Sequence, residues 1–252
     1  MGARLAIDAC AREADRYDGD MKNIRRTVPI IGIASLALAT PSASASIPPP
    51  PSAAELAQQG DDIAWSITEG LTTEIGPRMA GTEAEAAARR WALERLKALG
   101  FQNVREEPYQ MPVWVRGAEQ ASLIGPFQPQ KLAIAALGNS ASTGPQGIEG
   151  DIAYFASYDA LVAAPDIQVR GKIVFIDNQM QPAQDGSGYG YYGKGRFNGP
   201  NVASKKGAAA IVIRSIGTDD HRNPHTGVSG FEAGVKPIPA GAISNPGADL
   251  LV

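Results

Sequence analysis

Short apolar runs punctuated by glycine fill the second half of the 252-residue chain and restrict its fold more than any other feature. From about Leu132 these runs are KLAIAAL, GDIAYF, GKIVFID and AAAIVIRS, each with the length of a buried strand. The stretch NVASKKG before the last run has the pattern of a helix that leads into a strand. The pattern predicts a strand-rich α/β segment, and we place a domain boundary near residue 130.

Two amphipathic segments ahead of that boundary predict helices. The first, SAAELAQQGDDIAWSITEGL, opens with Ser52 and Glu55 in the spacing of a capping box. The second, GTEAEAAARRWALERLKALG, has its own capping box in Thr82 and Glu85 and a clear apolar stripe. Gly100 follows the stripe, where a glycine commonly ends a helix.

The segment from Met21 has the three parts of a secretory signal peptide, over residues 21–45. A basic start precedes the apolar run Val28–Ala39, and small residues then lead to a cleavage signal at Ala45. The apolar run is shorter than the roughly 20 residues of a membrane span, so we expect export with cleavage near Ala45 and no stable membrane anchor. Residues 46–60, which contain SIPPPP, read as a proline-rich tether.

Residues 1–20 form a charged stretch ahead of this signal, which is an unusual place for one. The pattern predicts that translation starts at Met21 and that residues 1–20 are a doubtful upstream extension. Cys10 is the only cysteine, so a chain that starts at Met21 has none, which suits an oxidising compartment. The formal charge of −3 gives no electrostatic reason to expect a nucleic-acid partner.

The stretch DGSGYGYYGKGRFNGPN imitates two nucleotide-binding motifs. Gly188, Gly190 and Gly193 satisfy G-x-G-x-x-G, and the same stretch reaches Lys194 in the spacing G-x-x-x-x-G-K. A phosphate loop needs a strand directly before it and a helix directly after it, and here about ten residues follow the preceding strand. Gly195 also replaces the hydroxyl residue that would hold magnesium. We therefore predict a flexible surface loop rich in glycine and tyrosine.

Both histidines, His221 and His225, lie in DDHRNPHTG, four positions apart and directly after two aspartates. On one helix face this spacing can hold zinc. Pro224 lies between them, so an uninterrupted helix is not expected and the geometric argument for a metal fails. No G-x-S-x-G elbow for a serine nucleophile occurs in the sequence.

Several stretches together resemble a family of secreted zinc exopeptidases. GPRMAGTEAEAAARRWALERLKALGF resembles the opening helix of the aminopeptidase and glutamate carboxypeptidase type. MPVWVRGAEQASL, RGKIVFID, AAAIVIRSIGTDDHRNPHTG and VKPIPAGAIS resemble the carboxypeptidase Q (plasma glutamate carboxypeptidase) branch of this type. The resemblance covers about residues 61–252.

The resemblance implies an incomplete α/β/α zinc peptidase domain. Its N-terminal helices and first strands would be residues 61–130, and residues 131–240 would be an inserted, strand-rich protease-associated domain. Residues 241–252 would begin the return to the peptidase domain. In the family the insert lies over the active site, so Arg222 and His225 become candidate contacts of a substrate cleft or lid.

The zinc ligands and the catalytic glutamate of the family follow the insert and begin with an H-x-D segment, which this sequence does not contain. The resemblance therefore transfers no catalytic and no metal-binding residue to the chain. Full-length members bind two zinc ions, but we expect no specific metal on these 252 residues. Whether the chain by itself is an enzyme stays open at this point.

We accordingly predict the N-terminal part of an exported zinc metalloexopeptidase for dipeptides or short peptides, inactive alone. Its partner would be a peptide substrate once the missing half completes it. The apolar face of the helix after Thr82 would lack most of its sheet, and a homo-oligomer would be one way to cover it. Two alternatives remain: a non-enzymatic protease-associated module that binds peptides or proteins, and one chain of a split peptidase.

Overall fold

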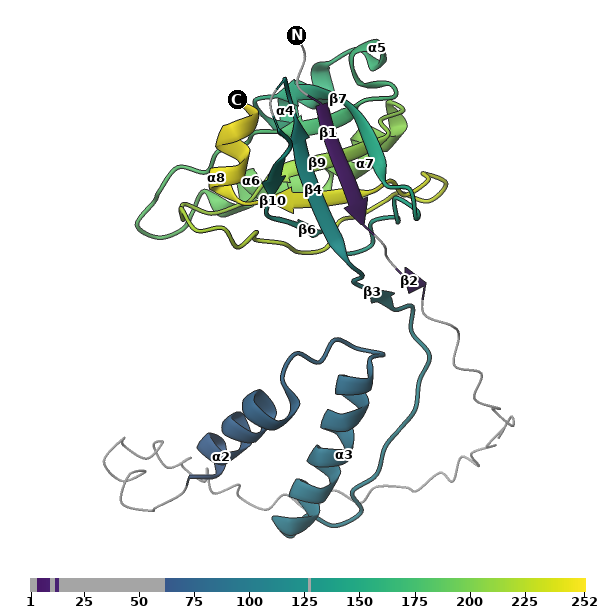
Figure 1. Cartoon of the computed structure of the whole chain (residues 1–252). Helices are drawn as coiled ribbons and strands as arrows, with labels where there is room; N and C mark the ends of the chain where they lie inside the picture. The colour runs from purple at the N-terminus through teal and green to yellow at the C-terminus, as the bar shows by residue number, and fades with distance from the viewer. Residues whose placement is uncertain (1–3, 10–11, 14–61, 127) are drawn as a thin grey trace, which may run out of the picture. The chain divides into compact units, whose positions relative to one another are not determined.

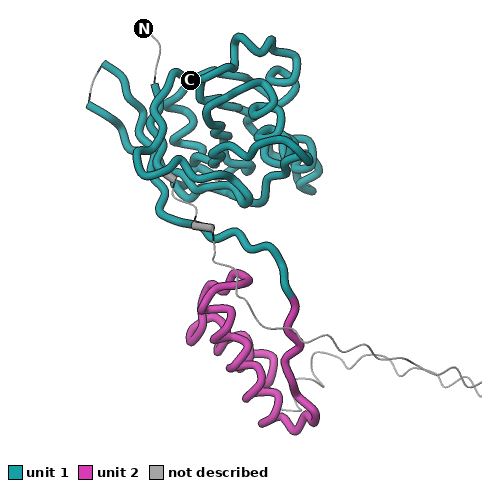
Figure 2. Tube along the Cα trace, turned by 90° about the vertical axis from the view of Figure 1, so that its right-hand side faces the viewer, with its two compact units in different colours: residues 1–14, 110–252 teal, residues 15–109 magenta. Residues whose placement is uncertain are grey.

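The computed structural model describes residues 4–9, 12–13, 62–126 and 128–252 (Figure 1). The predicted signal peptide, the tether and the capping box at Ser52 and Glu55 lie outside the described residues. The chain divides into two compact units, one of residues 15–109 and a larger one of residues 1–14 and 110–252 (Figure 2). The larger unit therefore includes strands before residue 130, because these pair with later strands. The domain boundary near residue 130 stays a prediction.

Two helices make up most of the described part of the smaller unit. They are α2 (Ile63–Gly70), which continues into the π-helical turn η1 (Leu71–Ile75), and α3 (Glu83–Ala98). A Cβ atom at Gly70 would lie 2.5 Å from the Trp91 ring, so the indole of α3 fits only against bare backbone of α2. Glycine at this position therefore allows the two helices to pack closely.

The predicted ends of α3 are confirmed. The Thr82 hydroxyl oxygen accepts a hydrogen bond of 3.2 Å from the backbone N–H of Glu85, which satisfies one free donor of the first turn. The Glu85 carboxylate pairs with Arg89 at 2.7 Å. At the other end Gly100 adopts a φ of 86°, and its N–H donates to the carbonyl of Lys97.

The apolar face of the smaller unit stays largely open. Within the described part of this unit, α3 contains no buried residue, although its stripe is apolar. Trp65 of α2 is 70% exposed, and Leu96 of α3 and Leu99, directly after α3, are exposed as well. Among the described residues, the apolar stripe of α3 is therefore at most partly covered.

An eight-stranded sheet forms the frame of the larger unit (Figure 1). Its strands in chain order are β1 (Arg4–Ala9), β4 (Glu119–Ile124), β5 (Gln130–Leu132), β6 (Ile134–Ala136), β7 (Ile148–Phe155), β8 (Ile173–Ile176), β9 (Ala210–Arg214) and β10 (Ala240–Ile243). Across the sheet the order is β5-β4-β1-β7-β8-β9-β10-β6. A separate two-stranded sheet pairs β2 (Arg12–Glu13) with β3 (Trp114–Val115).

The core lies on both faces of the parallel strands β7 to β10. Ile173 and Phe175 pack into one cluster with side chains of β1 and β4, whereas Val174 and Ile176 pack into another. Side chains of three short helices join the second cluster. These helices are α4 (Tyr158–Ala163), α5 (Asp166–Val169) and α7 (Gly199–Lys205). Burial on both faces explains why the strands read as continuous apolar runs.

The sheet curls toward closure. Its two end strands, β5 and β6, are joined in sequence by the single residue Ala133. Side chains also bridge β4 to β6: the Glu119 carboxylate accepts from the N–H of Ala136 at 2.7 Å, and Arg116 donates to the carbonyl of Ala136 at 2.6 Å. This curvature brings the first and last strands of the sheet together around the first core cluster.

Strand β1 gives residues 4–9 an integral place in the sheet, in contrast to the expectation that residues 1–20 are an upstream extension. It pairs antiparallel with β4 on one side and with β7 on the other. Leu5 is fully buried and Ile7 nearly so. That translation starts at Met21 stays a prediction, but a chain that began there would lack this central strand.

The glycine-rich stretch is helical, and the prediction of a flexible surface loop was wrong. Residues Tyr189–Phe197 form α6, and α7 follows after Asn198. Gly195 and Gly199 face Ile176 of β8, where added Cβ atoms would lie 3.7 and 3.1 Å from its side chain. The glycines therefore serve close helix–sheet packing. Among the described residues, no helix is long and apolar enough to cross a membrane.

Candidate peptide-contact site

The two residues proposed as substrate contacts lie in residues 215–230, here named the anchored loop, which follows β9. The carbonyl of Gly138 accepts from the N–H and the hydroxyl of Ser229, at 2.9 and 2.7 Å. The Asn245 side chain donates to the carbonyl of Asp219 at 2.9 Å. The segment is thus fastened near both ends, and its middle carries the exposed polar side chains.

His225 is held by its backbone and by its ring. Its N–H donates to the Ser215 hydroxyl at 2.8 Å, and its Nε2 lies 2.9 Å from the Tyr189 hydroxyl of α6. Arg196 donates to that same hydroxyl oxygen at 2.8 Å. The Tyr189 hydroxyl therefore links Arg196 to the His225 ring and fixes the orientation of that ring.

Arg196 holds Tyr189 and the anchored loop in place. The side chain is buried, stacks its guanidinium over the rings of Phe197 and Tyr189 at 4.6 and 5.5 Å, and donates to the carbonyl of Thr226 at 3.3 Å. A Cβ atom at Gly227 would lie 2.9 Å from the guanidinium carbon, so the loop needs glycine there. Arg196 therefore holds α6 against the anchored loop and sets the position of Tyr189.

His221 and Arg222 lie at the exposed surface of the anchored loop. Nδ1 of His221 accepts from the N–H of Asn223 at 3.2 Å and approaches the Asp219 carboxylate to 3.1 Å. Hydrogen-bond geometry is lacking in the second contact, since that Asp219 oxygen has no hydrogen-bond partner. The two histidines of the chain thus have separate partners. In the described parts of the chain, no group of three or more His, Cys, Asp or Glu side chains could hold a metal ion.

A second polar cluster lies where parallel strands end at their carboxyl edge. Arg214, the last residue of β9, pairs with Asp177 after β8 at 2.6 Å and with Asp249 at 2.8 Å. Tyr154 of β7 donates to the other oxygen of Asp177 at 3.1 Å. Arg214 also donates to the carbonyl of Asn245 at 3.1 Å, at the start of α8 (Asn245–Ala248). The cluster thus ties the C-terminal helical turn to the sheet edge.

The electrostatics of this cluster favour a structural role. Partial burial, and then the hydrogen bond to Asp177, raises the pKa of the Tyr154 phenol above its usual value. The phenol therefore stays protonated and donates at neutral pH. Arg214 is only 4% exposed, and the two carboxylates and one carbonyl receive its donors. The cluster offers neither a nucleophile nor a general base free for chemistry.

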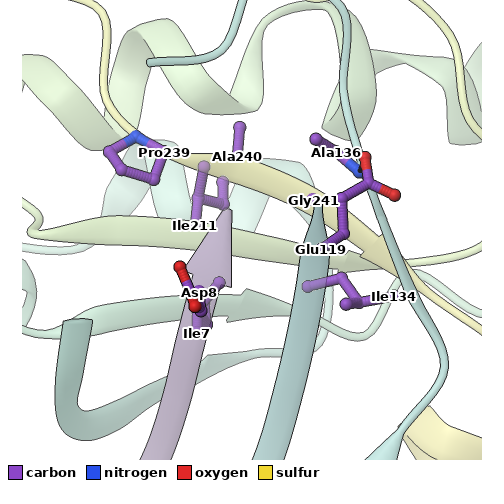
Figure 3. Close-up of a pocket in the computed structure, with 9 residues that line it drawn as sticks. All are labelled: Ile7, Asp8, Glu119, Ile134, Ala136, Ile211, Pro239, Ala240 and Gly241. Atoms are coloured by element: carbon purple, nitrogen blue, oxygen red, sulfur yellow. Dashed lines mark hydrogen bonds between the residues drawn. The ribbon is translucent and has the colours of Figure 1, made fainter. Parts of the chain in front are cut away.

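A narrow recess opens between β1, β6 and β10 (Figure 3). It is lined in part by Ile7, Asp8, Glu119 and Ile134, which the close-up labels. Its volume of about 10 Å³ corresponds to roughly one water molecule. A dipeptide does not fit there, so the exposed face of the anchored loop is the better candidate for peptide contact.

Sequence reasoning missed Tyr189, Arg196 and the partners of Arg214. Tyr189 and Arg196 stand seven residues apart, a spacing that places two side chains on one helix face, but the glycines between them concealed the helix. Asp177 and Arg214 each directly end an apolar strand run. Polar residues at the carboxyl ends of parallel strands meet at one sheet edge, and this signal was available in the sequence.

Comparison with known proteins places the chain among peptidases. No family model matches it. Carboxypeptidase Q of Bos taurus is 35% identical over 182 residues, which cover 72% of this chain and 37% of the relative. Carboxypeptidase Q of Homo sapiens is 33% identical over 181 residues, with the same two coverages. The chain thus spans about 37% of the length of these curated relatives.

A solved structure gives the same assignment at the level of the fold. The Peptidase M28 precursor from Shewanella amazonensis SB2B matches with a TM-score of 0.70 and 46% sequence identity. The match covers 79% of this chain and 45% of that protein. Because the sequence relatives and the structural neighbour agree over most of the chain, it belongs to the M28 peptidase family and, within it, to the carboxypeptidase Q branch.

Proposed function

We propose that the chain is the N-terminal part of an exported, zinc-dependent exopeptidase that releases terminal residues from dipeptides or short peptides. The observation that carries this proposal is the match itself. About 72% of the chain aligns with carboxypeptidase Q, yet the aligned part amounts to 37% of the relative. The activity of the whole protein would then require residues that this chain does not supply.

Within the described residues, the side chains do not fit a zinc centre. The chain has two histidines, and in the structure they have different partners, Tyr189 for His225 and Asn223 for His221. Zinc in proteins is held by three or four ligands at 2.0–2.3 Å, which requires a converging set. We therefore expect the zinc of the complete enzyme to bind outside this chain, and we expect these 252 residues to be inactive alone.

The two units match two roles within this proposal. The smaller unit would be the N-terminal part of the peptidase domain. Its exposed apolar side chains, such as Trp65 and Leu96, would pack against the sheet of the complete domain. The larger unit would be the protease-associated insert, since it holds both buried core clusters of the described residues. Alternatively, two copies of the chain would associate through the exposed apolar side chains of these helices.

Arg222 and His225 would contact the substrate from the insert. A guanidinium such as that of Arg222 pairs well with a peptide carboxylate. His225 presents an exposed imidazole ring, whose orientation Tyr189 and Arg196 fix. The two side chains could then bind and orient a peptide end, while the bond-breaking chemistry would come from the remainder of the enzyme.

We also propose that the protein is exported. Residues 21–45 would direct secretion, with cleavage near Ala45, and neither nucleic acid nor a membrane is expected as a partner. This location would give the enzyme access to peptides outside the cytoplasm.

Activity measured on the purified chain tests the proposal. With added zinc we expect no release of amino acids from dipeptides or short peptides, whereas full-length bovine carboxypeptidase Q under the same conditions serves as the positive control. Zinc-dependent turnover by the chain, abolished by a chelator, would falsify the proposed inactivity.

Two other functions are also compatible with the structure, because the larger unit contains both buried core clusters. It could act as a peptide-binding module without catalysis, or the chain could be one half of a split peptidase. Calorimetric titration with dipeptides separates them: tight binding that Arg222→Ala and His225→Ala weaken favours the module. Activity that returns when a separately encoded metal-binding half is added favours the split enzyme.

A further inference from the structure

Strand β1 fills a slot that is bounded on both sides by backbone. Its residues pair antiparallel with β4 from Arg4↔Ile124 to Ala9↔Glu119, and with β7 from Arg4↔Asp151 to Ile7↔Ile148. Removal of β1 would leave two facing strand edges with unpaired N–H and C=O groups. Such edges are templates for a further strand. The two edges and their apolar floor are named the β4–β7 slot.

The floor of the slot selects a strand with apolar residues at alternate positions. Leu5 is fully buried and Ile7 is 4% exposed, and both pack into the core cluster that contains Ile173 and Phe175. The intervening position, Ala6, faces the other side of the sheet. A polar residue in place of Leu5 or Ile7 would be desolvated without a hydrogen-bond partner, which is costly.

Two further features make the β4–β7 slot fit residues 4–9. Arg4 pairs with Glu149 at 2.7 Å and with Asp151 at 3.5 Å, so the β7 edge favours a basic residue at the start of the strand. Gly147, just before β7, adopts a φ of 66°, and a Cβ atom there would lie 2.9 Å from the carbonyl oxygen of Ile7. Glycine at this position lets the incoming backbone approach β7.

The strand and the rest of its unit are far apart in the sequence. Residues 1–14 belong to the same compact unit as residues 110–252, whereas residues 15–109 do not. The covalent path between β1 and its neighbours thus leaves the unit. Cleavage near Ala45 would cut this path, whereas a start at Met21 would leave β1 out of the chain. Either event would leave the β4–β7 slot intact. After such a cleavage, only the contacts of the strand, and not its chain connection, would hold it in place.

We propose that the β4–β7 slot is a strand-binding site, and that residues 4–9 of this chain occupy it as a separable strand. The strand remains bound when the backbone behind it is cut. The ligand class is an extended peptide with a basic first residue and apolar second and fourth residues, as in RLAIDA. This proposal is independent of the peptidase activity, because it concerns only the pairing within the larger unit.

The test uses the full chain with one specific protease site introduced after Asp20. The protein is folded first and then cut, and the 1–20 fragment is followed by gel filtration and mass spectrometry. We expect the fragment to elute with a monomer of the remaining chain. An excess of labelled peptide of residues 1–13 should replace it, as read by fluorescence anisotropy, and displacement without replacement should lower Tm by roughly 10 °C.

Matched variants separate specific pairing from general adhesion. The double variant Leu5→Asp/Ile7→Asp should lose its fragment on cutting, and the corresponding peptide should compete at least about 100-fold more weakly than wild type. An Arg4→Glu peptide should compete several-fold more weakly, because it meets Glu149 and Asp151. If the double variant does not fold, competition by the variant peptides on the wild-type cut protein decides alone.

Three results would overturn the proposal. One is release of the wild-type fragment on cutting with no fall in Tm. Another is equal competition by wild-type and doubly substituted peptides. The third is a dimer as the cut species, since the slot would then be filled by a second copy of the chain.

Discussion

Arg214 shows how much of this fold depends on single polar residues at strand ends. It is almost fully buried, yet its guanidinium reaches Asp177, Asp249 and the carbonyl of Asn245. One side chain thus joins the ends of β8 and β9 to the C-terminal helical turn. Arg196 likewise joins two segments, because it holds α6 to the anchored loop.

Replacement of Arg214 should therefore be costly. Arg214→Met keeps most of the apolar volume but leaves the largely buried Asp177 carboxylate without its cation, and we expect a loss of about 3 kcal/mol in the free energy of unfolding. Asp249→Asn is the matched control. Its carboxylate is 65% exposed, so a loss of less than about 1 kcal/mol is expected. Equal denaturant midpoints for Arg214→Met and wild type would show that the cluster contributes nothing to stability.

The elements differ in how locally their ends are determined. Helix α3 begins and ends on nearby signals, the hydroxyl of Thr82 and the left-handed backbone of Gly100. Helix α6 has no side-chain cap and carries three glycines within it. Its stability comes from packing against β8 and the anchored loop, where Arg196 is buried. A helix of this kind depends on its tertiary neighbours.

The cap of α3 can be tested by a small substitution. Thr82→Ala removes the acceptor for the N–H of Glu85 and should reduce helix stability by about 1 kcal/mol, seen as an earlier loss of helical circular dichroism on heating. Thr82→Ser retains an acceptor and should melt close to wild type. If the alanine and serine variants melt together, the hydroxyl does not stabilise the helix.

The whole molecule combines one unit with a closed core and one without. The larger unit surrounds its strands on both faces, and Leu5, Phe175 and Ile211 are fully buried. In the two helices of the smaller unit, Gly70 is the only buried residue among those that the structure describes. Units with few buried contacts open more easily, so resistance to proteases should differ between them.

Limited proteolysis should reveal this difference. We expect early cuts within residues 62–109 and a resistant fragment that begins near residue 110 and contains the strands β4 to β10 of the eight-stranded sheet. N-terminal sequencing and mass spectrometry of the fragments give the boundaries, and the same digest in denaturant shows which sites the protease can cut. A chain that resists evenly along residues 62–252 would contradict the division into units of unequal stability.

Local patterns accounted for a defined part of the structure. The strands β7, β8 and β9, the helix α7 before β9 and both ends of α3 follow from periodicity and from capping residues that act within a few positions. The α/β class and the resemblance to M28 peptidases could also be stated before any coordinates. These features share one cause, because each is determined by neighbours in the sequence.

Only the tertiary structure decided which distant segments meet. Leu5 and Ile7 read as part of an extension, yet pairing with β4 and β7 makes their strand central. Tyr189 and Arg196 read as loop residues, yet packing on β8 and the anchored loop makes them the support of His225. A strand slot or a buried guanidinium is completed by groups far along the chain. The sequence by itself therefore determined α3 and the strands β7, β8 and β9, whereas long-range pairing and burial determined β1, α6 and the candidate site.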